Sequence, residues 1–229
     1  MNKLQKFGGF AAIFEAITYI GAFIYFGALL EYPSTNDVAA KLAFLKQNHF
    51  GLAMSNLILY VLFGLALAVL VLATHQKVVS KQASLMKLAS LFGYIWVGLV
   101  IAAGMIGNIS LELVIRIAET DQTMARTIWL ATDAVVEGIG GGNEIVGGIW
   151  VLLLSIAALK ADELSKGVSY LGLFVGLAGI STVYPATLLT EIFGLSQIVW
   201  FVYLGIVLIK QSAVDKDIAA AQQQATLKS

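Results

Sequence analysis

The stretch that decides the fold runs from Met86 to Gly107 and reads MKLASLFGYIWVGLVIAAGMIG. Its one charged residue, Lys87, stands near the start, and no proline interrupts the run. A helix that crosses a bilayer needs about 20 consecutive, mostly apolar residues. This stretch meets that requirement by itself, so it predicts a transmembrane helix.

Similar apolar runs recur along the rest of the chain. The 229 residues are 59% hydrophobic and only 12% charged, with a mean hydropathy of +0.86. A soluble domain is about 45–50% apolar and about 25% charged, so the excess requires lipid as solvent. We therefore predict an all-α integral membrane bundle of six transmembrane helices. The predicted spans are residues 8–30, 51–73, 86–107, 132–159, 168–186 and 192–210.

The distribution of basic residues predicts the orientation of this bundle. Cytoplasmic loops of membrane proteins carry an excess of lysine and arginine. With six spans and both termini in the cytoplasm, residues 1–210 form the membrane domain and residues 211–229 a cytoplasmic tail. The cytoplasmic side then holds ten basic residues: Lys3, Lys6, Lys77, Lys81, Lys87, Lys160, Lys166, Lys210, Lys216 and Lys228. The outer loops hold four: Lys41, Lys46, Arg116 and Arg126.

Two outer connections are long enough to be structured. Asn36–Asn48 is expected to form a short surface helix. In Leu111–Gln122 the apolar residues recur at helical spacing, and Glu112 and Arg116 form an i,i+4 pair. This second segment would lie on the bilayer surface or cap the bundle.

Composition and motifs exclude several classes of chemistry. The net charge is zero, which indicates no nucleic-acid partner, and the absence of cysteine excludes disulfides and thiolate metal sites. His49 and His75 are expected near opposite membrane faces, so they cannot form a paired-histidine haem site. No serine-hydrolase, HExxH or Walker motif is present. We expect no cofactor, and an enzyme would have to work through carboxylates alone.

The fourth predicted span carries three acidic residues. Asp133, Glu137 and Glu144 are spaced i, i+4 and i+11, which on a regular helix points them within about 40° of one another. A carboxylate that faces lipid costs about 2.5–3.5 kcal/mol on insertion scales. These side chains should therefore face the bundle interior, water or a partner.

Glycine is concentrated beside these acids. Six of the eleven residues from Gly138 to Gly148 are glycine, in the sequence GIGGGNEIVGG. Glycines allow close helix packing in lipid, and they also allow an unwound segment whose carbonyls line a cavity. Each glycine in a helix interior costs about 1 kcal/mol, so we predict that the helix is irregular between Gly138 and Asn143.

Further polar residues extend the candidate site, while no lysine or arginine lies inside any predicted span. A pocket among them would be acidic and open outward, which favours a proton, a metal cation or an amine over an anion. The candidate ligand-binding residues are Glu144, Asn143, Glu137, Asp133, Asn56, Gln197 and Glu15.

A structural role is the alternative for each acid. Asp133 and Glu137 would then pair with Arg126. Glu144 and Glu15 would be protonated or hydrogen-bonded to Asn56 or Gln197. For the motif from Gly172 to Gly176, helix packing is the first interpretation and dimerisation the second.

Two segments carry a resemblance to a known family. Gly141–Leu159 (GGNEIVGGIWVLLLSIAAL) and Glu191–Ile209 (EIFGLSQIVWFVYLGIVLI) resemble small six-helix membrane proteins of bacteria, the family known as domain of unknown function 4386. The resemblance implies the six-span topology and residence in the bacterial cytoplasmic membrane. It implies no activity and no catalytic residues.

Three functions are compatible with these features. The first is binding or transport of a small cation, proton or amine at a pocket centred on Glu144, with the lipid bilayer as surroundings. The second is an accessory or signalling subunit whose glycine faces pack against another membrane protein, in a homo- or hetero-oligomer. The third is a carboxylate-dependent enzyme that acts on a lipid, and we expect binding rather than catalysis.

Reporter fusions test the predicted topology. Fusions at Ser80 and Ser229 should report a cytoplasmic location, and fusions at Ala40 and Ala118 an external one, because the lysine excess then lies inside. Paired alkaline phosphatase and fluorescent-protein reporters would measure this. An external Ser229 would contradict the six-span topology.

Overall fold

The computed structural model describes residues 2–33, 37–141 and 144–226, and within these ranges every element is helical. In chain order the first elements are α1 (Asn2–Ile24), the π-helical η1 (Tyr25–Leu29), α2 (Val38–Gln47), α3 (His49–Asn56), the π-helical η2 (Leu57–Leu62) and α4 (Phe63–Val78). The remaining elements are α5 (Ala83–Ala118), α6 (Gln122–Val136), the π-helical η3 (Glu137–Gly141), α7 (Ile145–Ala161), α8 (Lys166–Ser181) and α9 (Thr187–Thr226). The predicted all-α class is confirmed.

Within the described residues, five helical segments are long and apolar enough to cross a membrane. They are Lys3–Leu29, His49–Val78, Ala83–Ala118, Gln122–Ala161 and Thr187–Ala213. The shorter apolar helix α8 has 16 residues, below the usual length of about 20. The membrane character of the chain is thus supported, while the sixth span and the orientation stay predictions.

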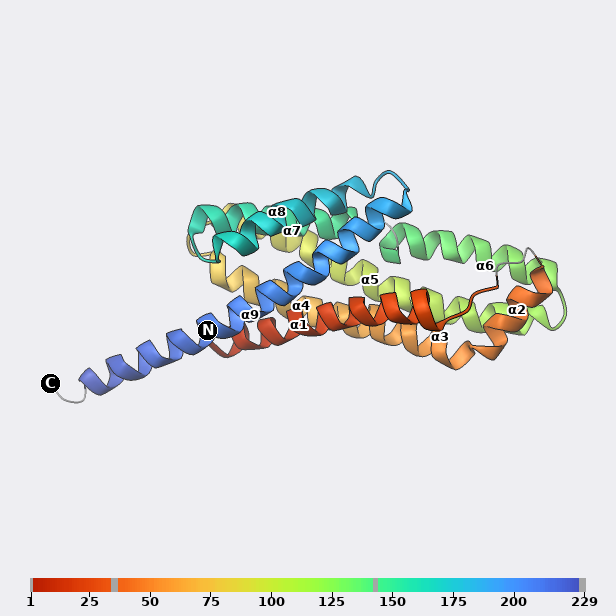
Figure 1. Ribbon diagram of the computed structural model, residues 1–229, viewed down its shortest axis with the longest axis horizontal. Helices are drawn as coiled ribbons and strands as arrows, with labels where there is room; N and C mark the ends of the chain where they lie inside the picture. The colour runs from red at the N-terminus through yellow and green to blue at the C-terminus, as the bar shows by residue number, and fades with distance from the viewer. Residues whose placement is uncertain (1, 34–36, 142–143, 227–229) are drawn as a thin grey trace.

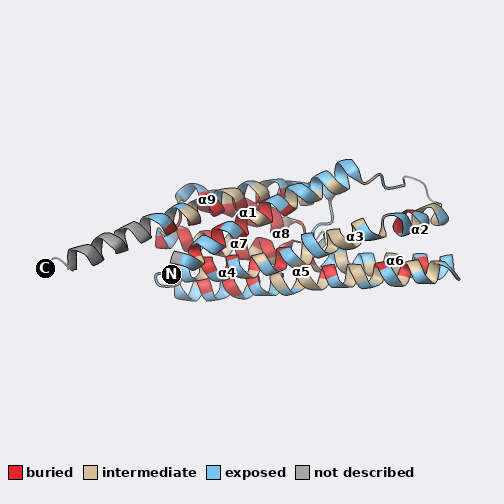
Figure 2. Cartoon of the chain, turned by 90° about the horizontal axis from the view of Figure 1, so that it is seen from below, coloured by how far each residue is buried: buried red, intermediate tan, exposed pale blue. Residues whose placement is uncertain are grey.

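The helices form two parts along the long axis of the molecule (Figure 1). The main bundle contains α1, α4, the first part of α5, α7, α8 and α9. The distal layer contains α2, α6 and the last part of α5. Figure 2 shows buried residues concentrated in the main bundle, whose core includes Trp96, Trp150 and Trp200. A separate, smaller core holds the distal layer together through Leu42, Phe44, Leu45, Leu111, Val114 and Ala125.

The packing of the distal layer shows which of the two roles expected for Leu111–Gln122, a surface helix or a cap of the bundle, is correct. Leu111 and Val114 are buried in its core, so this segment caps the bundle as the continuous end of α5, where the sequence suggested a helix ending at Gly107. Glu112 contacts His49 at 2.7 Å, and no ion pair with Arg116 is present among the described residues. The expected helix within Asn36–Asn48 is confirmed as α2, which starts where the Asp37 carboxylate accepts a hydrogen bond from the Ala39 N–H.

Helices of the main bundle approach one another at glycines. A Cβ atom at Gly148 of α7 would lie 2.7–2.8 Å from backbone atoms of α8 at Gly176, Gly179 and Ile180. Where α1 meets α9, a Cβ at Gly9 would lie 2.8 Å from the Gly205 carbonyl oxygen. Contacts this short are possible only without side chains. The packing interpretation of the glycines is therefore confirmed for these helices.

The motif from Gly172 to Gly176 also packs inside the chain. A Cβ at Gly172 would collide with the Ser155 hydroxyl, and a Cβ at Gly176 would lie 2.7 Å from the Leu152 backbone. This face of α8 is covered by α7, so the packing interpretation of this motif is confirmed.

Ion pairs join the loops at the end of the bundle far from the distal layer. Glu163, between α7 and α8, accepts the Lys81 ammonium group at 2.8 Å and the Lys77 ammonium group at 3.6 Å. Lys81 also donates to the Ala161 carbonyl at 3.1 Å. These contacts tie the end of α4 to the turn between α7 and α8.

Two alanine substitutions test the glycine contact. Gly148→Ala should lower the stability by about 1–3 kcal/mol, because overpacking here meets backbone. Gly98→Ala is the matched control, since a Cβ at Gly98 has no atom within 4 Å and alanine favours the helix. Thermal unfolding of the purified proteins in detergent measures both. Equal melting temperatures would contradict the role of Gly148.

Candidate functional site

The helix through the predicted fourth span is broken beside Glu144. α6 ends at Val136, η3 follows as a wider turn, and Gly140 leaves the helical conformation with φ 164° and ψ 7°. A regular helix resumes only at Ile145. The predicted irregularity is confirmed, although Gly142 and Asn143 lie outside the described residues. The break separates α6 in the distal layer from α7 in the main bundle (Figure 1).

Glu144 occupies the residue before α7 and is held there through its backbone. Its N–H donates to the Thr182 hydroxyl at 2.9 Å, and that hydroxyl donates to the Gly179 carbonyl at 2.7 Å. The Glu144 side chain does not cap α7, and only 7% of the residue is exposed. Within the described part of the chain, its Oε2 atom is buried without a hydrogen-bond partner. The Trp96 indole and the Tyr19 hydroxyl interact with this carboxyl group, and its unpartnered Oε2 atom remains available to a ligand.

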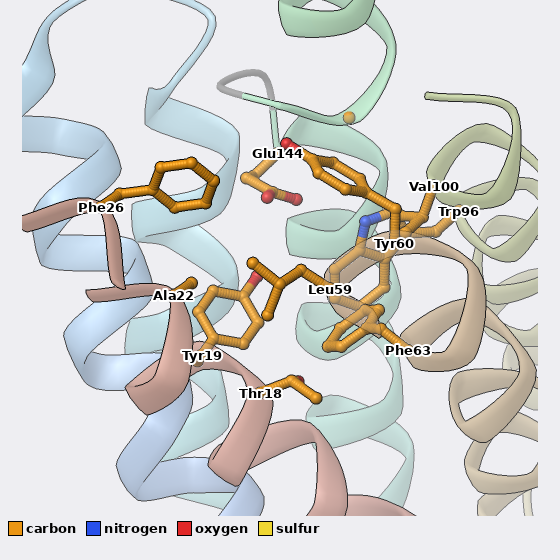
Figure 3. Close-up of a pocket in the computed structure, with 11 residues that line it drawn as sticks. Thr18, Tyr19, Ala22, Phe26, Leu59, Tyr60, Phe63, Trp96, Val100 and Glu144 are labelled. Atoms are coloured by element: carbon orange, nitrogen blue, oxygen red, sulfur yellow. The ribbon is translucent and has the colours of Figure 1, made fainter. Parts of the chain in front are cut away.

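A cavity of about 220 Å³, the central cavity, lies against this carboxyl group. In Figure 3 the rings of Tyr19, Tyr60 and Trp96 surround the space that Glu144 faces. The lining is otherwise mainly apolar and comes from α1, η1, η2, α4, α5 and η3. It consists of Thr18, Tyr19, Ala22, Phe26, Leu59, Tyr60, Phe63, Trp96, Val100, Gly140 and Glu144.

A second space of about 370 Å³, the lateral cavity, meets Glu144 from the side of α1 and α9. Phe23 and Phe26 line it and are 41% and 47% exposed, so it opens on the surface of the bundle. Its lining is Tyr19, Ala22, Phe23, Phe26, Gly27, Glu144, Thr190, Phe193 and Gly194. Among the described residues, Glu144 is the one acidic residue in the lining of the lateral and the central cavity.

The other two acids line a space of about 380 Å³ in the distal layer, the distal cavity. Asp133 and Glu137 lie there beside Asn56, while Phe26 and Tyr60 line both this cavity and the central one. The three acids thus lie along adjoining cavities. On a regular helix all three side chains would point the same way, but only Asp133 and Glu137 lie on one helical face. The break at Gly140 changes the direction of the chain before Glu144.

In the part of the chain that the structure describes, no lysine or arginine lines the central, lateral or distal cavity. Arg126 lines a smaller space of about 130 Å³ with Asp133 and Lys41. In the described ranges, no ion pair joins Arg126 to Asp133 or Glu137, so the pairing offered as the structural alternative for these two acids is absent there. Asp133, Glu137 and Glu144 thus leave these adjoining cavities acidic.

The remaining candidates do not reach Glu144. The Asn56 amide donates to the Asn108 Oδ1 atom at 3.1 Å, away from Glu144. Glu15 and Gln197 are fully buried, and in the described residues their side-chain oxygen and nitrogen atoms have no hydrogen-bond partner. The suggested hydrogen bonds from Asn56 or Gln197 to Glu144 or Glu15 are therefore wrong. Neither Glu15 nor Gln197 lines the central or the lateral cavity.

Sequence reasoning missed the aromatic residues of the site. Tyr19, Tyr60 and Trp96 come from three separate segments, and nothing in their local sequence links them. The feature that marks the site is the backbone conformation. The three π-helical segments η1, η2 and η3 all line the central cavity, through Phe26, Tyr60 and Gly140 among others. π-helical turns are rare and often occur at functional sites.

In comparisons with known proteins, no family model, no curated protein and no solved structure matches this chain. The resemblance to domain of unknown function 4386 thus stays a prediction. Among the described residues, no group of three or more His, Cys, Asp or Glu side chains is placed to hold a metal ion. Function has to be inferred from the cavities.

Cysteine labelling tests whether the distal cavity is open to water, and the native chain has no cysteine. Ser110→Cys, in the lining of the distal cavity, should react with a membrane-impermeant maleimide added outside intact cells. Ser155→Cys should react at least about tenfold more slowly, because Ser155 is 2% exposed under α8. Equal rates would contradict an open distal cavity.

Proposed function

We propose that this protein binds or transports a small cation, a proton or an amine at Glu144. The observation that carries this proposal is the buried Glu144 carboxyl group, which has an unpartnered oxygen and borders two cavities. A buried carboxylate without a positive partner is costly, and a bound cation would remove that cost. Ligand binding and electrostatic neutralisation would thus be the same event.

The distal cavity indicates the route by which a cation would reach Glu144. Asp133 and Glu137 are exposed, line this cavity and lack a basic partner among the described residues. An acidic cleft raises the local concentration of cations. Tyr60 lines both this cavity and the central one, so a cation that moves from one to the other would pass its ring on the way to Glu144.

The proposal includes six spans and cytoplasmic termini in a bacterial cytoplasmic membrane. Support for α8 as the sixth span comes from its glycine contacts with α7, which follow most of its length. Support for the orientation comes from the ten basic residues on one side against four on the other. The distal layer would then lie outside the cell, and the bacterial location follows from the family resemblance.

The two alternative functions have less support. An accessory subunit would present its glycine faces to a partner, but Gly148, Gly172 and Gly205 are used inside the chain. An enzyme that acts on a lipid is favoured by one observation, the opening of the lateral cavity near Glu144. Of the described residues, only Glu144 brings a carboxyl group to that cavity, which leaves acid–base chemistry without a second residue.

Replacement of Glu144 tests the proposal. Glu144→Gln keeps the size of the side chain and removes its charge. Saturating potassium or methylammonium chloride should raise the melting temperature of the wild-type protein in detergent. At a ligand concentration of 100 times Kd, the free energy of unfolding should rise by about 2.7 kcal/mol. This response should disappear in Glu144→Gln.

The matched control is Glu31→Gln, an exposed acid between η1 and α2 that should respond like the wild type. The same comparison from about pH 5 to 9 tests a proton as the ligand. Tyr19 and Tyr60 are the other titratable groups in the described lining of the central cavity, and a free tyrosine side chain ionises near pH 10, above this range. Unchanged cation and pH responses in Glu144→Gln would overturn the proposed function.

A further inference from the structure

We infer that the ligand at Glu144 is a monovalent organic ammonium ion that carries one apolar group. The ammonium group would lie in the central cavity and the apolar group in the lateral cavity. This inference rests on the proposed function and narrows it from cations in general to one chemical class.

The oxygen atoms around Glu144 suit the binding of an ammonium ion better than that of a bare metal ion. Ca²⁺ takes about 6–8 oxygen ligands, and Mg²⁺ about six in near-ideal octahedral geometry. One carboxyl group and the hydroxyls of Thr18, Tyr19 and Tyr60 are the side-chain oxygens in the central cavity. The Thr18 hydroxyl already donates to the Glu15 carbonyl at 2.8 Å. An ammonium ion needs only one anion and a few hydrogen-bond acceptors.

Aromatic rings supply the remaining stabilisation. Tyr19, Tyr60 and Trp96 surround the space that the carboxyl group faces, with Phe26 and Phe63 completing the lining (Figure 3). The faces of Trp, Tyr and Phe rings attract cations within about 6 Å, and aromatic cages of this type recognise substituted ammonium groups. A carboxyl group together with such rings matches the charge of an organic cation and also its apolar surface.

The lateral cavity gives the apolar group a place. Glu144 and Tyr19 line both cavities, so a ligand bound at the carboxyl group can extend from one cavity into the other. Apart from Glu144, Thr190 and the Tyr19 hydroxyl, the lateral lining is hydrocarbon or glycine. Its opening between η1 and the start of α9 would face the lipid, where an alkyl chain is favoured.

The charges of the site exclude a ligand that also carries an anionic group. None of the described residues that line the central, lateral or distal cavity is a lysine or an arginine. A phosphate beside the ammonium group, as in a lipid headgroup, would find no cation there and would meet the acids of the distal cavity. The inference is therefore a free amine and not a lipid headgroup.

A series of cations tests the ligand class on the wild-type protein in detergent. The probes are potassium, methylammonium, hexylammonium, neutral hexanol and phosphocholine, each titrated against melting temperature. Each buried methylene should strengthen binding about fourfold, so hexylammonium should bind at least about tenfold more tightly than methylammonium. Hexanol and phosphocholine should have no effect that depends on Glu144.

Two leucine substitutions test the place of the apolar group. Gly27 lines the lateral cavity, and a Cβ there meets no atom within 4 Å, so Gly27→Leu fills the cavity without disturbing helix contacts. It should weaken hexylammonium binding at least about tenfold and leave methylammonium binding unchanged. Gly21→Leu is the matched control, because Gly21 is equally open but lies outside both cavities, and it should bind both amines like the wild type.

The outcomes separate this inference from the proposed function. Equal, Glu144-dependent affinities for potassium, methylammonium and hexylammonium would overturn the organic ligand and leave the cation site standing. Binding of phosphocholine as tight as that of hexylammonium would assign the pocket to a lipid headgroup and would also overturn it. A loss of hexylammonium binding in Gly21→Leu equal to that in Gly27→Leu would overturn the assignment of the lateral cavity. Absence of any Glu144-dependent response to any of the cations would overturn the proposed function itself.

Discussion

The site depends on the backbone contact between α7 and α8 at Gly148. The two helices touch without intervening side chains, and this contact fixes the position of α7 along the axis of α8. At that position the Thr182 hydroxyl, just after α8, meets the Glu144 N–H at 2.9 Å. The position of the buried carboxyl group thus follows from a packing contact about one helical turn away. In a bilayer, where lipid is as apolar as leucine, contacts of this type are a main source of helix association.

Glycines also determine where the aromatic residues lie. Gly147 of α7 packs against the Trp96 ring, and Gly93 of α5 packs against Trp150. Trp96, Trp150 and Trp200 then follow one another through the core, with ring centroids 5.9 Å and 5.7 Å apart. The Trp200 indole N–H donates to the Val168 carbonyl at 3.1 Å, which anchors this row to α8. The site at Glu144 is therefore built on a rigid row of rings.

Much of the fold, but only part of the site, follows from sequence. Apolar runs and their lengths predict the helices, because burial in lipid requires them, and the cluster of glycines predicts the break before Glu144. The length of α5 was not predictable: Leu111 and Val114 look like an amphipathic surface segment until α2 and α6 cover them. The rings of Tyr19 and Tyr60 were missed because their proximity to Glu144 depends on how three distant segments pack.

The continuity of α5 beside the interrupted path from α6 to α7 has a mechanical consequence. α5 has 36 residues, about 54 Å of unbroken helix, so it transmits any tilt from the main bundle to the distal layer like a rod. The path from α6 to α7 is not a single α-helix, because α6 ends at Val136, η3 follows with Gly140 outside the helical conformation, and α7 begins at Ile145. Gly140, where the helical conformation is lost, lines the central cavity together with Glu144, so the geometry at this break bears both on the angle between α6 and α7 and on the shape of the cavity around that carboxyl group.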